Sequence, residues 1–251
     1  MFKLHHGNCL DLMPKIPDGS IDMVLVDPPY GTTSCKWDTV IDLDKMWEQL
    51  KRIVKPNGAI VIFGSEPFSS VLRLSNLEMF KYDWIWEKCK PSNFMLANKQ
   101  PLKYHEILSI FYKKQCTYNK QFWYTKPMNT VYRQCGADEN SVIGKNKSIK
   151  AKELNSKKRN PKSIIKIPEV IGNSKEKAEG KHPTQKPVAL IEYLLKTYTK
   201  ENDLVLDFAM GSATTGVGCI KLSRNFIGME IEKEIFETAK KRLCKTYECC
   251  R

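Results

Sequence analysis

The stretch that decides the fold reads VLVDPPYG, from Val24 to Gly31. Three apolar residues lead into an acid, two prolines, an aromatic ring and a glycine. A central strand cannot continue through Pro28 and Pro29, because proline lacks the N–H group and fixes φ. The stretch therefore predicts a buried strand that stops abruptly and presents one carboxylate and one ring at its end.

Strand patterns alternate with helix patterns on both sides of this stretch. Apolar strands are expected at residues 20–27, 59–64, 82–87, 106–113, 203–208 and 225–231. Helical spacing is expected at residues 42–58, 67–77, from 187 onward, 211–222 and 232–247. This alternation predicts an α/β fold with a mostly parallel sheet that helices cover on both faces. In such a sheet, ligands bind beyond the carboxyl ends of the strands.

The composition narrows the class of protein. The chain has 251 residues, and its hydrophobic fraction of 41% suits one large domain or a domain with an insertion. No apolar run approaches transmembrane length, and the start MFKLHHGNCL lacks the apolar core of a signal peptide. We therefore expect a cytoplasmic protein without a membrane partner. The nine cysteines form no Cys-x-x-Cys pair, which favours reduced thiols.

The middle of the chain departs from this regular pattern. Periodicity is lost from about residue 114 to 186. Lys145 to Lys186 holds 13 Lys and Arg against 4 Asp and Glu, so nine of the formal charges of +13 lie there. Such a segment is either a solvated lysine-rich loop or a surface that binds the phosphates of nucleic acid. Charge alone leaves both interpretations open.

Asp27-Pro28-Pro29-Tyr30 has a specific chemical use. The nitrogen of an aromatic NH₂ group is a poor nucleophile, because its lone pair is delocalised into the ring. Acceptors on both N–H bonds free that lone pair, and the Asp27 carboxylate and the Pro28 carbonyl are suitable acceptors. Tyr30 can stack on the base, which must first be flipped out of a duplex. The alternative to this catalytic role is a purely structural one, in which the segment is a rigid turn with an aromatic ring on the surface.

Two further strand ends carry polar residues. LVLDFAMGSATTG, from Leu204 to Gly216, places a turn of small residues between a strand and a helix, where backbone N–H groups can approach a ligand. Its glycine spacing does not match a dinucleotide fingerprint. Glu230 lies about twenty residues further along, where an acid binds ribose hydroxyls in nucleotide folds. Taken alone, Glu230 is equally compatible with an acid at a helix N-terminus.

Taken together, these motifs resemble a family, the β-class of DNA amino-methyltransferases that use S-adenosylmethionine. DPPY precedes the glycine turn in that class, and a recognition region lies between them. HGNCLDLM (His6–Met13) and KHPTQKP (Lys181–Pro187) complete the resemblance. It is clear over about residues 4–44 and 180–242, looser over 47–113 and absent between. It implies a Rossmann-like class I methyltransferase fold with a basic insertion for DNA recognition.

The resemblance also implies site residues. Asp27, Pro28, Pro29 and Tyr30 would hold and activate the target amine. The implied cofactor-binding residues are Asn8, Cys9, Asp27, Thr184, Lys186, Pro187, Asp207, Phe208, Gly211, Ser212, Thr214 and Glu230. The product would be S-adenosylhomocysteine, and no metal is implied. This chain departs from the family where Asn8 replaces a frequent Asp and where Ala209, Met210 and Ala213 interrupt the usual turn. Ala213 adds a methyl group where backbone is expected to approach the ligand.

These observations lead to a set of expectations. Residues 1–113 form the catalytic half of the domain, 114–180 the recognition insertion, and 181–251 the cofactor-binding half. The reaction is methylation of adenine N6 in double-stranded DNA, because Asp at position 27 leans toward adenine in the family and Ser toward cytosine. A restriction endonuclease partner and a homodimer both stay open.

Alternative functions also stay open. The nearest is methylation of cytosine N4 on the same fold. Methylation of RNA or of a protein amide fits the basic insertion and the motif order less well. A protein of another class, which binds DNA without catalysis, would have no need of an intact DPPY segment.

Overall fold

The computed structural model describes residues 1–31, 38–124, 158–170 and 185–250. These residues fall into two compact units. The larger unit combines Met1–Asn119 with Ser163–Arg251, and the smaller unit is Lys120–Lys162. The larger unit holds the sheet, the helices and the cavity described below.

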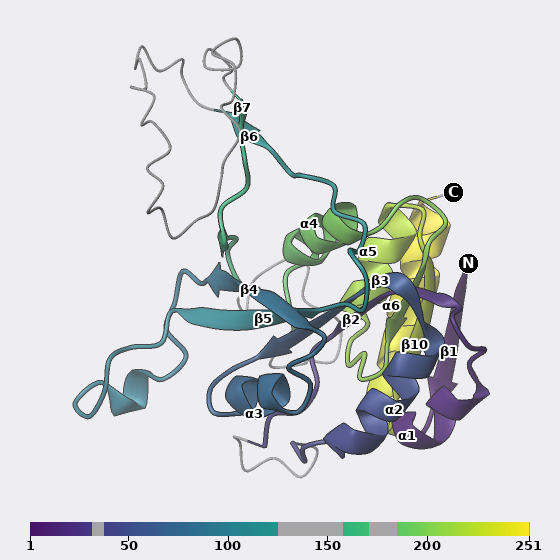
Figure 1. Cartoon of the computed structure of the whole chain (residues 1–251), viewed down its shortest axis with the longest axis horizontal. Coiled ribbons are helices and arrows are strands. Elements are labelled where there is room, and N and C mark those ends of the chain that lie inside the picture. The colour runs from purple at the N-terminus through teal and green to yellow at the C-terminus, as the bar shows by residue number, and fades with distance from the viewer. Residues whose placement is uncertain (32–37, 125–157, 171–184, 251) are drawn as a thin grey trace, which may run out of the picture. The chain divides into compact units, whose positions relative to one another are not determined.

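An eight-stranded sheet forms the centre of the larger unit (Figure 1), in the order β1-β10-β9-β2-β3-β5-β4-β8. Its strands are β1 (Phe2–His6), β2 (Ile21–Val26), β3 (Val54–Gly64), β4 (Phe80–Glu87), β5 (His105–Phe111), β8 (Ile164–Lys166), β9 (Leu204–Asp207) and β10 (Asn225–Glu230). The five strands from β1 to β3 in this order are parallel, and β5 runs antiparallel to both β3 and β4. The predicted mostly parallel α/β sheet is confirmed.

Helices cover both faces of the sheet, because its central strands are apolar on both sides. Met23 and Leu25 of β2 pack with α4 (Val188–Tyr198), α5 (Thr214–Lys221) and α6 (Lys233–Cys249). Val24 and Val26 pack on the opposite face with α1 (Cys9–Leu12), α2 (Leu43–Ile53) and α3 (Phe68–Leu74). This alternation follows from the two-residue side-chain period of a strand. Two short 3₁₀ helices, η1 (Met13–Lys15) and η2 (Phe94–Leu96), complete the larger unit.

One predicted helix ends earlier than expected, and one strand was not predicted. The helix expected over 42–58 ends at Ile53, because β3 begins at Val54 and runs through Pro56 and Gly58, which were expected to stop the helix. The pattern did not reveal β1, which lies at the sheet edge beside β10.

The segment between the two halves holds three short strands among its described residues. Within the smaller unit, β6 (Trp123–Tyr124) pairs with β7 (Lys158–Arg159). In contrast, β8 lies inside the range predicted as an insertion and pairs with β4 of the main sheet. The proposed division at residues 114 and 180 therefore runs through the larger unit. Among the described residues, no helix has the length and apolar character needed to span a membrane.

Candidate functional site

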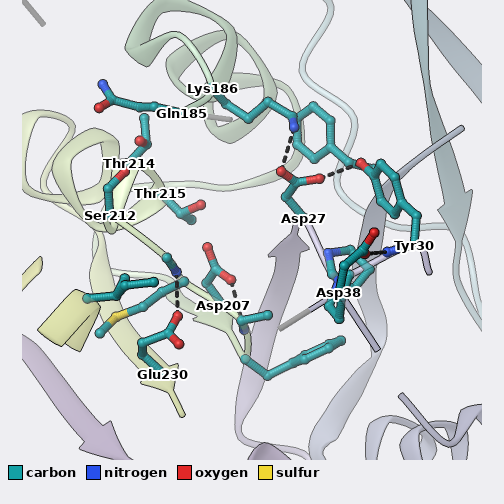
Figure 2. A pocket seen from close by; sticks show the side chains of 18 of the residues that line it. Asp27, Tyr30, Asp38, Gln185, Lys186, Asp207, Ser212, Thr214, Thr215 and Glu230 are labelled. Atoms are coloured by element: carbon teal, nitrogen blue, oxygen red, sulfur yellow. Dashed lines mark hydrogen bonds and ion pairs between the residues drawn. The ribbon is translucent and has the colours of Figure 1, made fainter. Parts of the chain in front are cut away.

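A cavity of about 840 Å³ opens where the parallel strands end. Asp27 directly follows β2, Asp207 ends β9 and Glu230 ends β10, and all three line the cavity. Figure 2 shows Asp27, Tyr30 and Lys186 at one end, with Asp207 and Glu230 at the other. The sequence placed these residues up to 203 positions apart; their convergence follows from the parallel pairing of β2, β9 and β10. The cavity is large enough for a cofactor.

At the first end, the DPPY turn is held by hydrogen bonds from its backbone to one side chain, Asp38. The carboxylate of Asp38 accepts hydrogen bonds from the N–H groups of Tyr30, at 2.7 Å, and Gly31, at 2.9 Å. Gly31 has a φ of +67°, which suits glycine because it has no Cβ. Pro28 and Pro29 line the cavity. The turn therefore presents Asp27 and Tyr30 in one conformation.

Tyr30 contacts Asp27 directly. Its hydroxyl donates a short hydrogen bond to Asp27 Oδ1, and its ring stacks on Phe68 with centroids 5.2 Å apart. Burial, together with the nearby Asp27 carboxylate, raises the pKa of Tyr30 well above its usual value. The hydroxyl is therefore neutral and acts as a donor.

Lys186 holds the other oxygen of the same carboxylate. Its Nζ lies 2.5 Å from Asp27 Oδ2 and 3.2 Å from Glu106 Oε2. Burial opposes the charge on this ammonium, but the carboxylates of Asp27 and Glu106 raise the pKa of Lys186. Lys186 is therefore a buried cation, and the resemblance did not indicate its contact with Asp27.

At the second end, Asp207 is a buried carboxyl group that has no cationic partner among the described residues. Burial raises the pKa of Asp207 to about 7, although hydrogen bonds from Thr215 and from the Ala209 N–H group oppose the shift. Within the described part of the chain, neither Asp207 nor Glu230 forms a salt bridge. A buried acid of this kind favours a positively charged ligand.

Glu230 joins the glycine turn to the end of β10. Its Oε2 accepts from the Gly211 N–H group at 3.0 Å, and its Oε1 accepts from the Glu232 N–H group at 2.9 Å. Burial raises the pKa of Glu230 as well. Arg242 of α6 donates to the Ser212 carbonyl at 2.8 Å, so the turn is held from two sides.

Most of the residues implied by the resemblance line the cavity. These are Asn8, Cys9, Asp27, Pro28, Pro29, Tyr30, Lys186, Asp207, Phe208, Gly211, Ser212, Thr214 and Glu230. Asn8 also caps α1, because its side chain accepts from the Leu10 N–H group. Burial raises the pKa of the Cys9 thiol to about 11, so it is neutral. Thr184 lies outside the described residues.

Two residues named from the sequence are not among those that line the cavity. Pro187 is buried at the start of α4, and its role toward the cofactor stays a prediction. Ala213 is also absent from the lining. Its side chain is fully buried in the core, and its backbone adopts the left-handed conformation with φ of 56°. Its methyl group therefore meets protein rather than the cavity.

Seven charged residues that line the cavity were not predicted from the sequence, and three of them lie at the end that holds Asp27. Asp38 clamps the DPPY turn, while Glu106 and Lys88 form a pair 3.0 Å long beside Lys186. Glu106 stands at the start of β5, and Lys88 follows β4. The one sequence signal for Glu106 and Lys88 was a charged residue at the end of an apolar strand. Such residues are too common to identify a site.

Comparison with known proteins identifies the family. A model described as DNA methylase, of N6 and N4 type, matches residues 21–241. A type II methyltransferase of Moraxella bovis, M2.MboI, is 30% identical over 96% of this chain and 87% of its own length. The type II methyltransferase M.HinfI of Haemophilus influenzae is 29% identical over 94% of this chain and 67% of its own length. The chain belongs to this DNA methylase family.

Solved structures support the same assignment. The M1.HpyAVI complex with S-adenosylmethionine has 28% identity and a TM-score of 0.62, covering 97% of this chain and 99% of that one. The cytosine-N4-specific PvuII DNA methyltransferase has 18% identity and a TM-score of 0.65, which shows a shared fold. The protein is an S-adenosylmethionine-dependent DNA methyltransferase of the amino type.

The residues of the second end fit this cofactor. S-adenosylmethionine carries a positive sulfur and an ammonium group, which suit the buried Asp207 carboxyl group. Its ribose hydroxyls can donate to Glu230, whose carboxylate retains acceptor capacity beyond its two backbone partners. Gly211, with φ of 50° and no Cβ, leaves its backbone open to the cavity.

Proposed function

We propose that this protein methylates N6 of adenine in double-stranded DNA at a specific sequence. The observation that carries the proposal is the fixed Asp27-Pro28-Pro29-Tyr30 turn at one end of a cavity whose other end fits the cofactor. The fold alone does not choose the base, because a cytosine-N4-specific enzyme shares it. Asp27 favours adenine, since the resemblance associates Asp in this position with adenine and Ser with cytosine.

The residues of the chain support an in-line displacement. When bound, S-adenosylmethionine supplies a methyl group on a positively charged sulfur, and the thioether S-adenosylhomocysteine leaves. The Asp27 carboxylate and the Pro28 carbonyl each accept a hydrogen bond from one N–H group of the adenine amine. The lone pair of the nitrogen then points toward the methyl carbon. The amine loses one proton as the nitrogen–carbon bond forms, and the Asp27 carboxylate that accepts its N–H bond is placed to take it. Proximity and orientation supply much of the rate.

Several assignments belong to the same proposal. Asn8, Cys9, Phe208, Ser212, Thr214 and Glu230 enclose the cofactor, while Asp207 faces its positive groups. The segment 114–180 recognises the DNA sequence, and its basic residues bind the phosphates. The affinity for DNA should therefore fall steeply as the salt concentration rises. A cytoplasmic location, a homodimer and a restriction endonuclease partner stay predictions.

A nucleoside digest tests the choice of base. The purified protein is incubated with unmethylated duplex DNA and S-adenosylmethionine, and the digested nucleosides are identified by mass spectrometry. N6-methyladenine is the expected product. N4-methylcytosine would overturn the choice of base, while DNA binding without any methylated base would favour a protein that binds DNA without catalysis.

A further inference from the structure

Both oxygens of the Asp27 carboxylate have partners within the protein. The Tyr30 hydroxyl donates to Oδ1, and the Lys186 ammonium lies 2.5 Å from Oδ2 (Figure 2). The proposed function requires this carboxylate to accept a hydrogen bond from the target amine. The amine must therefore share the Asp27 carboxylate with Tyr30 and Lys186, so the strength of their contacts with Asp27 affects the rate of methyl transfer.

Lys186 has a second carboxylate partner, Glu106, which does not touch Asp27 in any hydrogen bond or ion pair of the described residues. Glu106 Oε1 also lies 3.0 Å from the Lys88 ammonium. The side chains of Glu106, Lys88 and Lys186 are only 17%, 10% and 10% exposed. Although burial opposes its ionisation, the ammonium groups of Lys186 and Lys88 lower the pKa of Glu106.

The fold brings these four charges to one place from separate segments. Because β5 runs antiparallel to β3 and β4, its first residues lie next to the carboxyl end of β4. Glu106 and Lys88 therefore lie at the same end of the strands as Asp27, which follows β2. Along the series Lys88, Glu106, Lys186 and Asp27, positive and negative charges alternate. Each interior member is compensated from two sides, as buried charges require.

We propose that Glu106 is a positioning residue for methyl transfer: it holds the Lys186 ammonium beside Asp27 while the target amine takes its place on the carboxylate. Without the charge of Glu106, Lys186 keeps Asp27 as its one carboxylate partner among the described residues. Their contact then tightens, and the amine has to compete with the ammonium for the Asp27 carboxylate. This inference rests on the proposed function, because it requires Asp27 to accept a hydrogen bond from the target amine.

A double-mutant cycle tests the inference. The wild type, Glu106→Gln, Lys186→Met and the double variant are compared in single-turnover methyl transfer with saturating DNA and cofactor. We expect Glu106→Gln to slow transfer about 10- to 100-fold, as small misplacements of reacting groups do. The Kd for S-adenosylmethionine should stay within about twofold, because Glu106 acts on the transfer step and not on ground-state binding. The double variant should be no slower than Lys186→Met, because Glu106 acts through Lys186.

A matched control is available on the same strand pair. Glu87 forms a salt bridge with Lys166 and is 41% exposed, and the ion pairs of Lys186 among the described residues are with Asp27 and Glu106 instead. Glu87→Gln should transfer methyl groups at the wild-type rate. If Glu106→Gln melts below the assay temperature, Glu106→Asp replaces it in the cycle. This variant keeps the charge and shortens the side chain by one methylene, so a smaller loss is expected.

Two results would overturn the inference. One is a Glu106→Gln enzyme as fast as the wild type, and the other is a double variant whose loss equals the product of the two single losses. In both cases the wild type still methylates DNA, so the proposed function stands. A wild-type protein that methylates no base would overturn the proposed function instead, and with it the inference.

Discussion

The two ends of the cavity handle negative charge in opposite ways. Asp27 is compensated by the Lys186 ammonium and the Tyr30 hydroxyl, so the protein itself supplies its partners. Among the described residues, Asp207 has only neutral hydrogen-bond partners, and its pKa rises to about 7. The protein therefore leaves the second end short of positive charge, which a cationic ligand can supply. Under the proposed function, the same residue type binds a substrate amine at one end and a cationic cofactor at the other.

The largest expected effect comes from Asp27→Ala. This variant removes the acceptor at the catalytic end and leaves the cofactor end intact. Methyl transfer should fall about 100- to 1,000-fold, as for the loss of a preorganised electrostatic group. Single-turnover kinetics measure the rate, and calorimetry should show S-adenosylmethionine bound with a Kd within about threefold of wild type. Transfer at the wild-type rate would show that the two ends do not divide the work as described.

Glu230→Gln tests the other end. Hydrogen bonds to a charged carboxylate contribute about 1.5 to 3 kcal/mol, so the Kd for S-adenosylmethionine should rise about 10- to 100-fold. Calorimetric titration measures this change. Glu237→Gln on the exposed face of α6 is the control and should bind as the wild type does. An unchanged Kd in Glu230→Gln would remove Glu230 from the cofactor site.

The raised pKa of Asp207 predicts a pH dependence of cofactor binding. A carboxyl group with a pKa near 7 is largely protonated at pH 6 and largely ionised at pH 8. A cation binds the ionised form better, so affinity should rise with pH across this range, by up to about tenfold. Titrations in buffers of different ionisation enthalpy should also show proton release on binding near pH 7. Asp207→Asn should lose both effects, and a wild type whose affinity falls with pH would contradict the assignment.

The smallest effect concerns the turn that supports the cofactor end. Ala213 adopts the left-handed conformation, which costs a residue with a Cβ about 1 kcal/mol or more. Ala213→Gly should relieve this cost and raise the free energy of unfolding by up to about 1 kcal/mol, less the lost packing of one buried methyl group. Denaturant unfolding measures it. Because Ala213 does not line the cavity, the Kd for S-adenosylmethionine should not change.

Local sequence was enough for much of this structure. β2 and the DPPY turn follow from an apolar run that meets two prolines, and α4 follows from the spacing of Leu190, Ile191, Leu194 and Leu195, all buried as predicted. Glu106 and Asp38 could not be predicted this way. The role of Glu106 depends on which strands become neighbours, and the role of Asp38 depends on the conformation of the loop that follows the DPPY turn. Neither leaves a periodic pattern in the sequence.

The place of β1 has a consequence for how the chain folds as it is synthesised. β1 and β2 are consecutive in sequence, yet β10 and β9 lie between them in the sheet. Until residues 204–230 are made, β1 and the neighbouring edge of β2 lack their partners. Unpaired apolar strand edges promote aggregation, and pairings between distant segments form slowly. A nascent chain that stalls before residue 204 therefore exposes its central strand, and it completes this sheet only after β9 and β10 have been synthesised.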